Sequence, residues 1–369
     1  MGRLELHPGA WIGSAVSRLV LRDGARELLL NALTPAERLS LAATALAWEG
    51  RGPELDHEAA RIALELARTS DPGHVAVELA RAVEGPVREG IFAQVRTLLE
   101  GDGRSLAYGL RLFASHHRQI TLHARGVAGR RILELGPGYS LAPGLLLVAA
   151  GAASWTGVDP FPIATRDAAH YRALREEVLA DRGVVRGTDH EQASQELLRR
   201  LDLLMSCEGD QVQLDGRRVR MLRASADALP LADGSQDVVI SNAVLEHVRD
   251  PAAVVRESMR VLAPGGIGVH QIDLRDHRDF SRPLEFLCLR AEEWERGFAT
   301  VPFDYTNRWR ASEFLSAFRA AGAEVLQHDV TLTARLDAGL RARLAPEFRA
   351  REAADLEALS LALVVRRPA

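Results

Sequence analysis

The spacing of apolar residues divides the chain into two parts. In residues 1–125, apolar side chains recur at i, i+3, i+4 and i+7 with charges between them, as in LTPAERLSLAATALAWEG and EGPVREGIFAQVRTLLEG. Thr34 precedes Pro35 in the manner of an N-cap before proline at the first helical position. We therefore expect a helical accessory region over residues 1–125, which could serve as a dimer interface, a lid or a substrate wall.

From residue 126 onward, short apolar runs alternate with helical stretches. Seven runs predict strands, at residues 131–135, 154–158, 219–223, 238–241, 268–272, 323–328 and 359–365. Helical spacing between them predicts helices at residues 141–150, 251–262 and 311–321. This alternation is typical of an α/β domain, and we expect residues 126–369 to form a doubly wound, seven-stranded, mostly parallel Rossmann-like sheet.

Two connections in this domain are too long for simple crossovers. The first, at about 161–217, contains two helical patterns at residues 166–180 and 191–205. The second, at about 275–310, is rich in tryptophan, phenylalanine and tyrosine. Long insertions at strand ends commonly build lids or binding walls, so we expect helical lid insertions at both places.

The composition narrows the class of protein. The 369 residues carry 46 basic and 50 acidic side chains, a net charge of -4, which argues against binding nucleic acid through bulk positive charge. All the basic residues are arginine, so no Schiff-base or P-loop lysine exists, and the bias is typical of a GC-rich bacterial genome. The two cysteines lack metal-ligand spacing, and no apolar run approaches the ~20 residues of a membrane span. We expect a cytoplasmic protein that does not bind membranes.

The chemistry begins where the first two strands end. The first strand runs into ELGPG, and glycines there allow a ligand to approach the backbone closely. The second ends in Asp159, 21 residues beyond Gly138, which is the spacing of an acid that binds ribose hydroxyls. The pair predicts a nucleoside-containing ligand. Leu141, in place of a third glycine, and Pro137, which lacks a backbone donor, disfavour a nicotinamide dinucleotide.

Five motifs follow in order over about residues 130–273: ELGPG, VDP, ADALPL, DVVISNAVLEHV and VLAPGG. This set resembles the class I S-adenosylmethionine-dependent methyltransferases, in particular their small-molecule branch. The resemblance implies S-adenosylmethionine as methyl donor, with the glycine turn cradling its methionine part. It assigns cofactor-binding roles to Glu134, Gly136, Pro137, Gly138, Asp159, Pro160, Asp227, Ala228, Ser241 and Asn242. Asp237, which opens the fourth strand, is expected to support structure instead.

Candidates for the acceptor side follow the fourth and fifth strands. His247 lies in LEHV, and Asp273 and His277 lie in HQIDLRDH, where an acid could orient a histidine as general base. These three are the predicted catalytic residues. Asp273 and Asp276 could instead hold a divalent metal, although the ligand set is incomplete and a metal is not expected.

A looser resemblance concerns the substrate. HQIDLRDH, followed by an aromatic insertion and YTNRWRASEFLSAFRAAGAEV, is similar to bacterial methyltransferases of glycan and secondary-metabolite pathways. It implies substrate-side roles for His270, Asp276, Tyr305, Asn307 and Arg308. Polar and aromatic groups together suit a sugar or another hydroxylated molecule.

The sequence therefore predicts O-methylation of a hydroxylated small molecule, such as a glycan precursor or a secondary metabolite. N- or C-methylation in a natural-product pathway stays open, because the cofactor half of the site does not encode the acceptor. A non-catalytic S-adenosylmethionine-binding interaction protein is the alternative from another class. The N-terminal helices could also join two copies into a homodimer.

Overall fold

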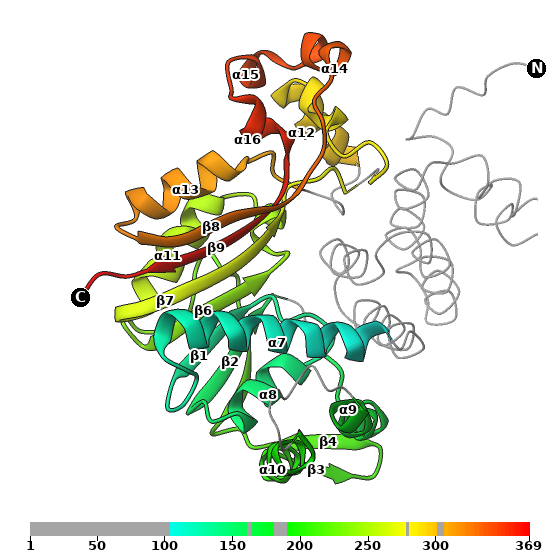
Figure 1. Cartoon of the computed structure of the whole chain (residues 1–369), viewed down its shortest axis with the longest axis vertical. Helices are drawn as coiled ribbons and strands as arrows, with labels where there is room; N and C mark the ends of the chain where they lie inside the picture. Colours follow the sequence, from blue (N-terminus) through cyan, green and yellow to red (C-terminus); the bar gives the residue numbers. More distant parts are fainter. Residues whose placement is uncertain (1–103, 161–163, 181–189, 278–279, 301–305) are drawn as a thin grey trace, which may run out of the picture. The chain divides into compact units, whose positions relative to one another are not determined.

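The computed structural model describes residues 104–160, 164–180, 190–277, 280–300 and 306–369 (Figure 1). The chain divides into two compact units. One comprises Met1–Gly101 and Glu292–Tyr305, and the other comprises Asp102–Ala291 and Thr306–Ala369. The helices predicted before residue 104, and Tyr305, lie outside the described residues. The second unit, called the sheet unit below, contains all the other predicted site residues.

The sheet unit is built on seven strands in the order β5-β2-β1-β6-β7-β9-β8. Their bounds are β1 Arg131–Leu135, β2 Ser154–Asp159, β5 Val219–Arg223, β6 Gln236–Asn242, β7 Leu262–Asp273, β8 Glu324–Thr333 and β9 Ala358–Arg366. Strands β5, β2, β1, β6 and β7 are parallel, and β9 runs antiparallel to both β7 and β8. Every predicted strand is present, and the predicted doubly wound, mostly parallel sheet is confirmed.

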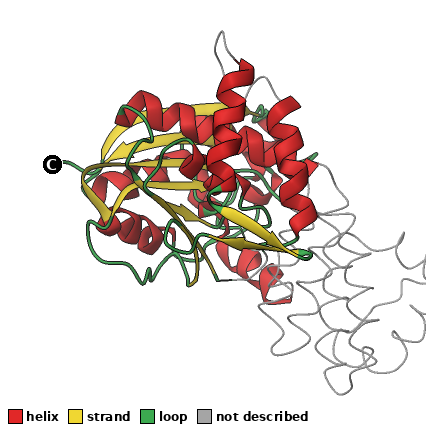
Figure 2. Ribbon diagram, turned by 90° about the horizontal axis from the view of Figure 1, so that it is seen from below, coloured by secondary structure: helices red, strands yellow, loops and turns green. Residues whose placement is uncertain are grey.

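Helices cover both faces of this sheet (Figures 1 and 2). One face packs against α7 (Arg104–Ala124) and α8 (Ala142–Ala149), and the two insertion helices α9 (Ala168–Ala180) and α10 (His190–Asp202) extend the same core over α7 and α8. The other packs against α11 (Pro251–Val261) and α13 (Ala311–Ala320). A side chain at Gly144 would overlap the indole of Trp155, so α8 lies directly on the sheet. None of the described helices is long and apolar enough to cross a membrane.

The first insertion differs from its prediction after α10. The helix ends at Asp202, not at residue 205, and a two-stranded hairpin follows, with β3 (Met205–Glu208) antiparallel to β4 (Gln211–Leu214). Gly209 adopts a φ of +61° in the turn between them, a conformation that glycine reaches without strain. The strands are short and largely exposed, so they lack the apolar alternation that would have predicted them.

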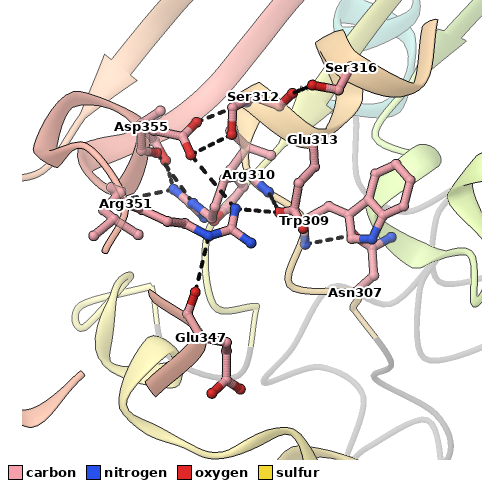
Figure 3. A network of polar contacts seen from close by, with 12 residues as sticks. Asn307, Trp309, Arg310, Ser312, Glu313, Ser316, Glu347, Arg351 and Asp355 are labelled. Carbon is pink, nitrogen blue, oxygen red and sulfur yellow. Dashed lines mark hydrogen bonds and ion pairs between the residues drawn. The ribbon is translucent and has the colours of Figure 1, made fainter. Parts of the chain in front are cut away.

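The end of the chain is tied to the sheet by a buried arginine that the sequence did not single out (Figure 3). Three short helices, α14 (Ala338–Arg343), α15 (Pro346–Arg349) and α16 (Ala353–Glu357), lie between β8 and β9. Arg310, fully buried before α13, donates to the carbonyls of Leu274 at 2.7 Å and Leu356 at 3.0 Å, and also to that of Ala358. One side chain thereby joins α13, the end of β7 and the start of β9.

The strand order reverses between β1 and β6, because β2 lies on one side of β1 and the later strands on the other. In doubly wound sheets, ligands bind outside the carboxyl ends of the strands at such a switch point. The turns after β1 and β6 are therefore where a site is expected.

Candidate active site at the carboxyl edge of the sheet

The glycine turn after β1 is shaped by its backbone. Gly136 and Gly138 have φ values of +61° and +71°, which L-residues with side chains rarely adopt. A Cβ at Gly136 would lie 2.6 Å from Val244 Cγ2, whereas one at Gly138 would have no atom within 4 Å. Gly136 therefore lets the turn close against the segment after β6, and Gly138 leaves open space that a ligand could fill.

Glu134 lies beneath this turn in a buried position. Its carboxylate accepts a hydrogen bond of 2.8 Å from Trp155 Nε1 on the neighbouring strand. Burial raises the pKa of Glu134 to about 7, although the hydrogen bond from Trp155 works in the opposite direction. The Glu134 side chain thus links β1 to β2 directly below the glycines.

The other predicted cofactor residues lie along the same edge. Asp159 is buried at the end of β2, and its backbone carbonyl accepts a 3.3 Å hydrogen bond from Ala224, just beyond β5. Pro160 follows Asp159 and is half-buried, whereas Asp227 and Ala228 are exposed in the segment after β5. The ends of β1, β2 and β5 thus bring these residues to one side of the switch point.

The end of β6 carries Ser241 and Asn242. Ser241 is buried, and its hydroxyl lies 2.8 Å from His270 Nδ1 on β7, so its side chain is engaged inside the sheet. Asn242 Nδ2 donates to the Tyr108 hydroxyl of α7 at 2.5 Å. The next residue, Ala243, has a φ of +51°, an uncommon conformation for a residue with a Cβ. The chain therefore turns sharply where β6 meets the glycine turn.

Beyond that turn, four titratable side chains form what we call the polar cluster: Glu246, His247, Asp273 and His277. One ligand atom from each of Glu246, His247 and His277 lies within 4.8 Å of the other two. The His247 and His277 rings are 4.8 Å apart between centroids, and His277 Nε2 lies 3.4 Å from Asp273 Oδ2. The fold thus brings together the three predicted catalytic residues and adds Glu246.

The two carboxyl groups of the cluster occupy opposite environments. Glu246 is fully buried, and burial raises its pKa to about 8. Burial would also raise the pKa of Asp273, but hydrogen bonding to His277 and Arg275 outweighs it and holds that pKa well below its usual range. Near neutral pH, Asp273 is therefore ionised whereas Glu246 retains a proton.

The predicted substrate residues have mixed positions. His270 is buried on β7, against Ser241 and Phe318, and burial lowers its pKa to about 3. Asn307 Nδ2 donates to the carbonyls of Leu245 at 2.7 Å and Val248 at 3.1 Å. Both side chains thus have partners within the domain.

The remaining two residues are also described. Arg308 binds the Leu289 carbonyl and Glu347, and its guanidinium lies over the Phe348 ring. Asp276 is buried, and in the sequence it lies between Arg275 and His277. Their roles toward an acceptor stay predictions.

Sequence reasoning missed Glu246, although the LEHV motif contains it. The missing signal was burial: Glu246 is 2% exposed, and a glutamate on a turn after a strand is normally expected at the surface. Asn307 explains the burial in part, because its backbone NH donates to the Glu246 carbonyl at 2.7 Å and fixes the short 3₁₀ turn Leu245–His247.

Comparisons with known proteins match part of this domain to methyltransferases. A family model described as a methyltransferase domain matches residues 177–269, a range that begins after β2 and thus excludes the glycine turn. An uncharacterized methyltransferase from Mycobacterium sp. (strain KMS) is 49% identical over 61 residues, which are 16% of this chain and 23% of that protein. One from Mycobacteroides abscessus is 48% identical over 52 residues, 14% of this chain and 20% of that protein. The matches span less than a quarter of these relatives' length.

Solved structures with a similar chain path are distant. An S-adenosylmethionine-dependent methyltransferase from Mesorhizobium loti is 17% identical, with 65% of this chain and 92% of that chain covered and a TM-score of 0.35. An arsenic(III) S-adenosylmethionine methyltransferase from Chlamydomonas reinhardtii is 21% identical, with 66% and 64% covered and a TM-score of 0.32. A methyltransferase domain thus matches residues 177–269, which lie within the unit built on the observed doubly wound sheet. The five ordered motifs resemble those of the class I S-adenosylmethionine-dependent methyltransferases.

Proposed function

We propose that this protein transfers the methyl group of S-adenosylmethionine to a hydroxyl oxygen of a small molecule, such as a glycan precursor or a secondary metabolite. The observation that carries the proposal is the contact between the two turns. Gly136 lies against Val244, and Glu246 and His247 follow two and three residues later. The predicted cofactor turn and the polar cluster are thus neighbours at the switch point, as donor and acceptor must be for an in-line transfer.

The residues present fit the cofactor. A Cβ at Gly138 would enter open space on the glycine turn, where we assign the methionine part. Asp159 would hold the ribose hydroxyls, with Pro160 beside the adenine, and Asp227 and Ala228 would meet the adenine edge. Because the Ser241 side chain is bonded to His270, Asn242 is the better candidate for the methionine amino group.

S-adenosylmethionine supplies a methyl group already activated on a sulfonium. In the reaction, the carbon–sulfur bond breaks and a carbon–oxygen bond forms, while sulfur keeps the electron pair and the acceptor oxygen loses its proton. The protein must align the oxygen and ease that proton loss. The polar cluster is suited to this task, since Asp273 orients His277 and His247 lies against the same ring. Such machinery favours a hydroxyl over an amine, because a neutral amine attacks without prior proton loss.

The test begins with the cofactor. Calorimetric titration of S-adenosylmethionine and S-adenosylhomocysteine into the wild type should show binding, and Asp159→Ala should weaken it at least tenfold. Asp329→Ala, which changes an exposed acid on the edge strand β8, is the matched control and should bind like the wild type. A labelled-methyl screen of sugars and phenols would follow. A folded wild type that binds neither compound would refute the proposal.

Dimerisation through residues 1–125 stays part of the proposal. Sedimentation equilibrium of the full chain tests it, since a concentration-dependent doubling of mass is expected.

A further inference from the structure

The polar cluster contains a buried oxygen with no partner. Glu246 Oε1 accepts a 3.2 Å hydrogen bond from the Asp273 backbone NH, which fixes the carboxyl group. Glu246 Oε2 is buried and has no hydrogen-bond partner among the described residues. Buried polar atoms are nearly always paired, so an unpaired carboxyl oxygen beside two imidazoles calls for a ligand that the side chains alone do not supply.

The chemistry around this oxygen suits a metal cation. Two imidazoles and one carboxylate form a three-ligand set that proteins use for zinc in catalytic sites and for non-haem iron(II), with at least one coordination position left open. Imidazole favours first-row transition metals over magnesium or calcium. The set therefore points to a cation of the zinc and iron(II) type.

The residues around the three ligands include a carboxylate that could orient a metal-binding histidine. A histidine that binds a metal through one ring nitrogen usually gives the other to a carboxylate, which fixes the ring. His277 Nε2 lies 3.4 Å from Asp273 Oδ2, and Asp273 is itself held by Arg275 at 2.5 Å. Once Glu246 is ionised as a ligand, Glu246 and Asp273 carry two negative charges against one positive charge on Arg275, which leaves one net negative charge for a cation to offset.

We propose that Glu246, His247 and His277 bind one divalent first-row transition-metal cation, with Asp273 holding His277 from outside the coordination sphere. Ligands at about 2.1 Å from zinc lie roughly 3.4 Å apart in a tetrahedral site. The three atoms lie within 4.8 Å of one another, so binding requires a modest rotation of the half-buried imidazoles and no movement of the sheet.

The catalytic use of this metal site rests on the proposed function, and the bound cation would explain how the polar cluster acts on the acceptor. The acceptor oxygen would take the open coordination position, where the cation weakens its hold on the proton, which leaves to water. His247 and His277 would then serve as metal ligands. The site also accounts for a buried carboxyl group beside the cofactor turn, which a free imidazole base does not require.

The test uses the full chain without an affinity tag, stripped with a chelator and dialysed. Calorimetric titration with Zn²⁺ should show one site per chain, and Co²⁺ should give the visible absorption bands of a four- or five-coordinate ion. Glu246→Gln, which keeps the shape of the side chain, should weaken Zn²⁺ binding at least 100-fold. Asp273→Asn should weaken it about 10- to 100-fold, as expected of an outer partner, and keep the stoichiometry of one. His328→Ala, on the exposed edge strand β8, should bind like the wild type.

The outcomes separate the metal site from the proposed function. Absence of one-to-one Zn²⁺ binding, or binding that Glu246→Gln leaves unchanged, overturns the metal site even where S-adenosylmethionine still binds. Methyl transfer at full rate by the metal-free protein overturns the part of the cation in the reaction, and leaves the proposed function standing. Zn²⁺ binding by a protein that does not bind S-adenosylmethionine would instead support the metal site and refute the proposed function.

Discussion

The two halves of the carboxyl edge are built by different means. The proposed cofactor half is shaped by backbone, since Gly136 and Gly138 adopt left-handed conformations within one short contiguous segment. The proposed acceptor half is made of side chains from the turn after β6 and the end of β7, and Asn307 and Arg310, which are distant in sequence, hold these segments by hydrogen bonds. A contiguous, backbone-shaped site can be recognised from sequence, whereas a site assembled from distant side chains needs the fold.

The largest expected effect separates the two halves functionally. His277→Ala should reduce methyl transfer about 100- to 10,000-fold, because it removes a group that acts on the acceptor in the transition state. The affinity for S-adenosylmethionine should stay within about twofold, since His277 lies outside the cofactor turn. Single-turnover rates and calorimetry measure the two quantities. Loss of cofactor affinity comparable to the loss in rate would show that the halves are not independent.

A second prediction concerns what holds the acceptor half together. Arg310→Met should lower the free energy of unfolding by about 3–5 kcal/mol, because buried carbonyls, including those of Leu274 and Leu356, lose their donor. Arg343→Met is the matched control. The Arg343 side chain is 58% exposed and pairs with Glu285 at 3.8 Å, so we expect a loss of less than about 1 kcal/mol. Urea unfolding measures both, and equal losses would contradict the assignment of Arg310 as the main tie.

The third prediction tests the backbone-shaped half. Gly136→Ala should cost about 2 kcal/mol of stability, because the left-handed backbone and the contact with Val244 both oppose a side chain. Gly138→Ala shares the backbone strain but meets open space, so it should cost only about 1 kcal/mol.

Cofactor affinity should show the effect of the Gly138 substitution more clearly than stability does. The side chain introduced by Gly138→Ala enters the space proposed for the methionine part. This variant should therefore bind S-adenosylmethionine at least tenfold more weakly than the wild type, although its loss of stability is small. Unfolding curves and calorimetry on the same samples check both quantities. A Gly138→Ala protein with unchanged affinity would place the cofactor elsewhere on the turn.

Much of the fold could be predicted because its signals are local. The apolar runs gave all seven sheet strands, and the helices α8, α9, α11 and α13 lie where helical spacing predicted them. The β3–β4 hairpin and α14 to α16 were missed. These elements are short and mostly exposed, so they carry little periodicity, and their tertiary contacts stabilise them more than their own sequences do.

The candidate site also has parts that local sequence signals could not predict. His247 and His277 are 30 residues apart, and only the neighbouring positions of β6 and β7 bring their rings together. The looser resemblance predicts a substrate-side role for Asn307, whereas the hydrogen bonds of its side chain to the carbonyls of Leu245 and Val248 depend on a segment about 60 residues earlier and could not be predicted. Glu246 shows the remaining gap, because its burial follows from tertiary packing around the turn.

The smallest expected effect lies at the opposite edge of the sheet. Asp237, at the start of β6, forms two hydrogen bonds with the Arg131 guanidinium, of 3.0 and 2.9 Å, and accepts a third of 2.8 Å from its backbone NH. The Arg131 side chain is 44% exposed, so Asp237→Asn should lower the free energy of unfolding by less than about 1 kcal/mol.

Hydrogen bonding to Arg131 lowers the pKa of Asp237 in the folded protein. A carboxyl whose pKa is lower when folded stabilises at pH values above its unfolded pKa, about 4, and loses that contribution as the pH falls through the folded pKa. The difference between wild type and Asp237→Asn in urea unfolding should thus be constant from pH 5 to 7 and shrink below about pH 4. Cofactor affinity should be unchanged, because ligands bind at the carboxyl ends of these strands and Asp237 lies at an amino end. A variant with weakened S-adenosylmethionine binding would show that the two edges of the sheet are coupled, and that the division between a structural and a functional edge is too simple.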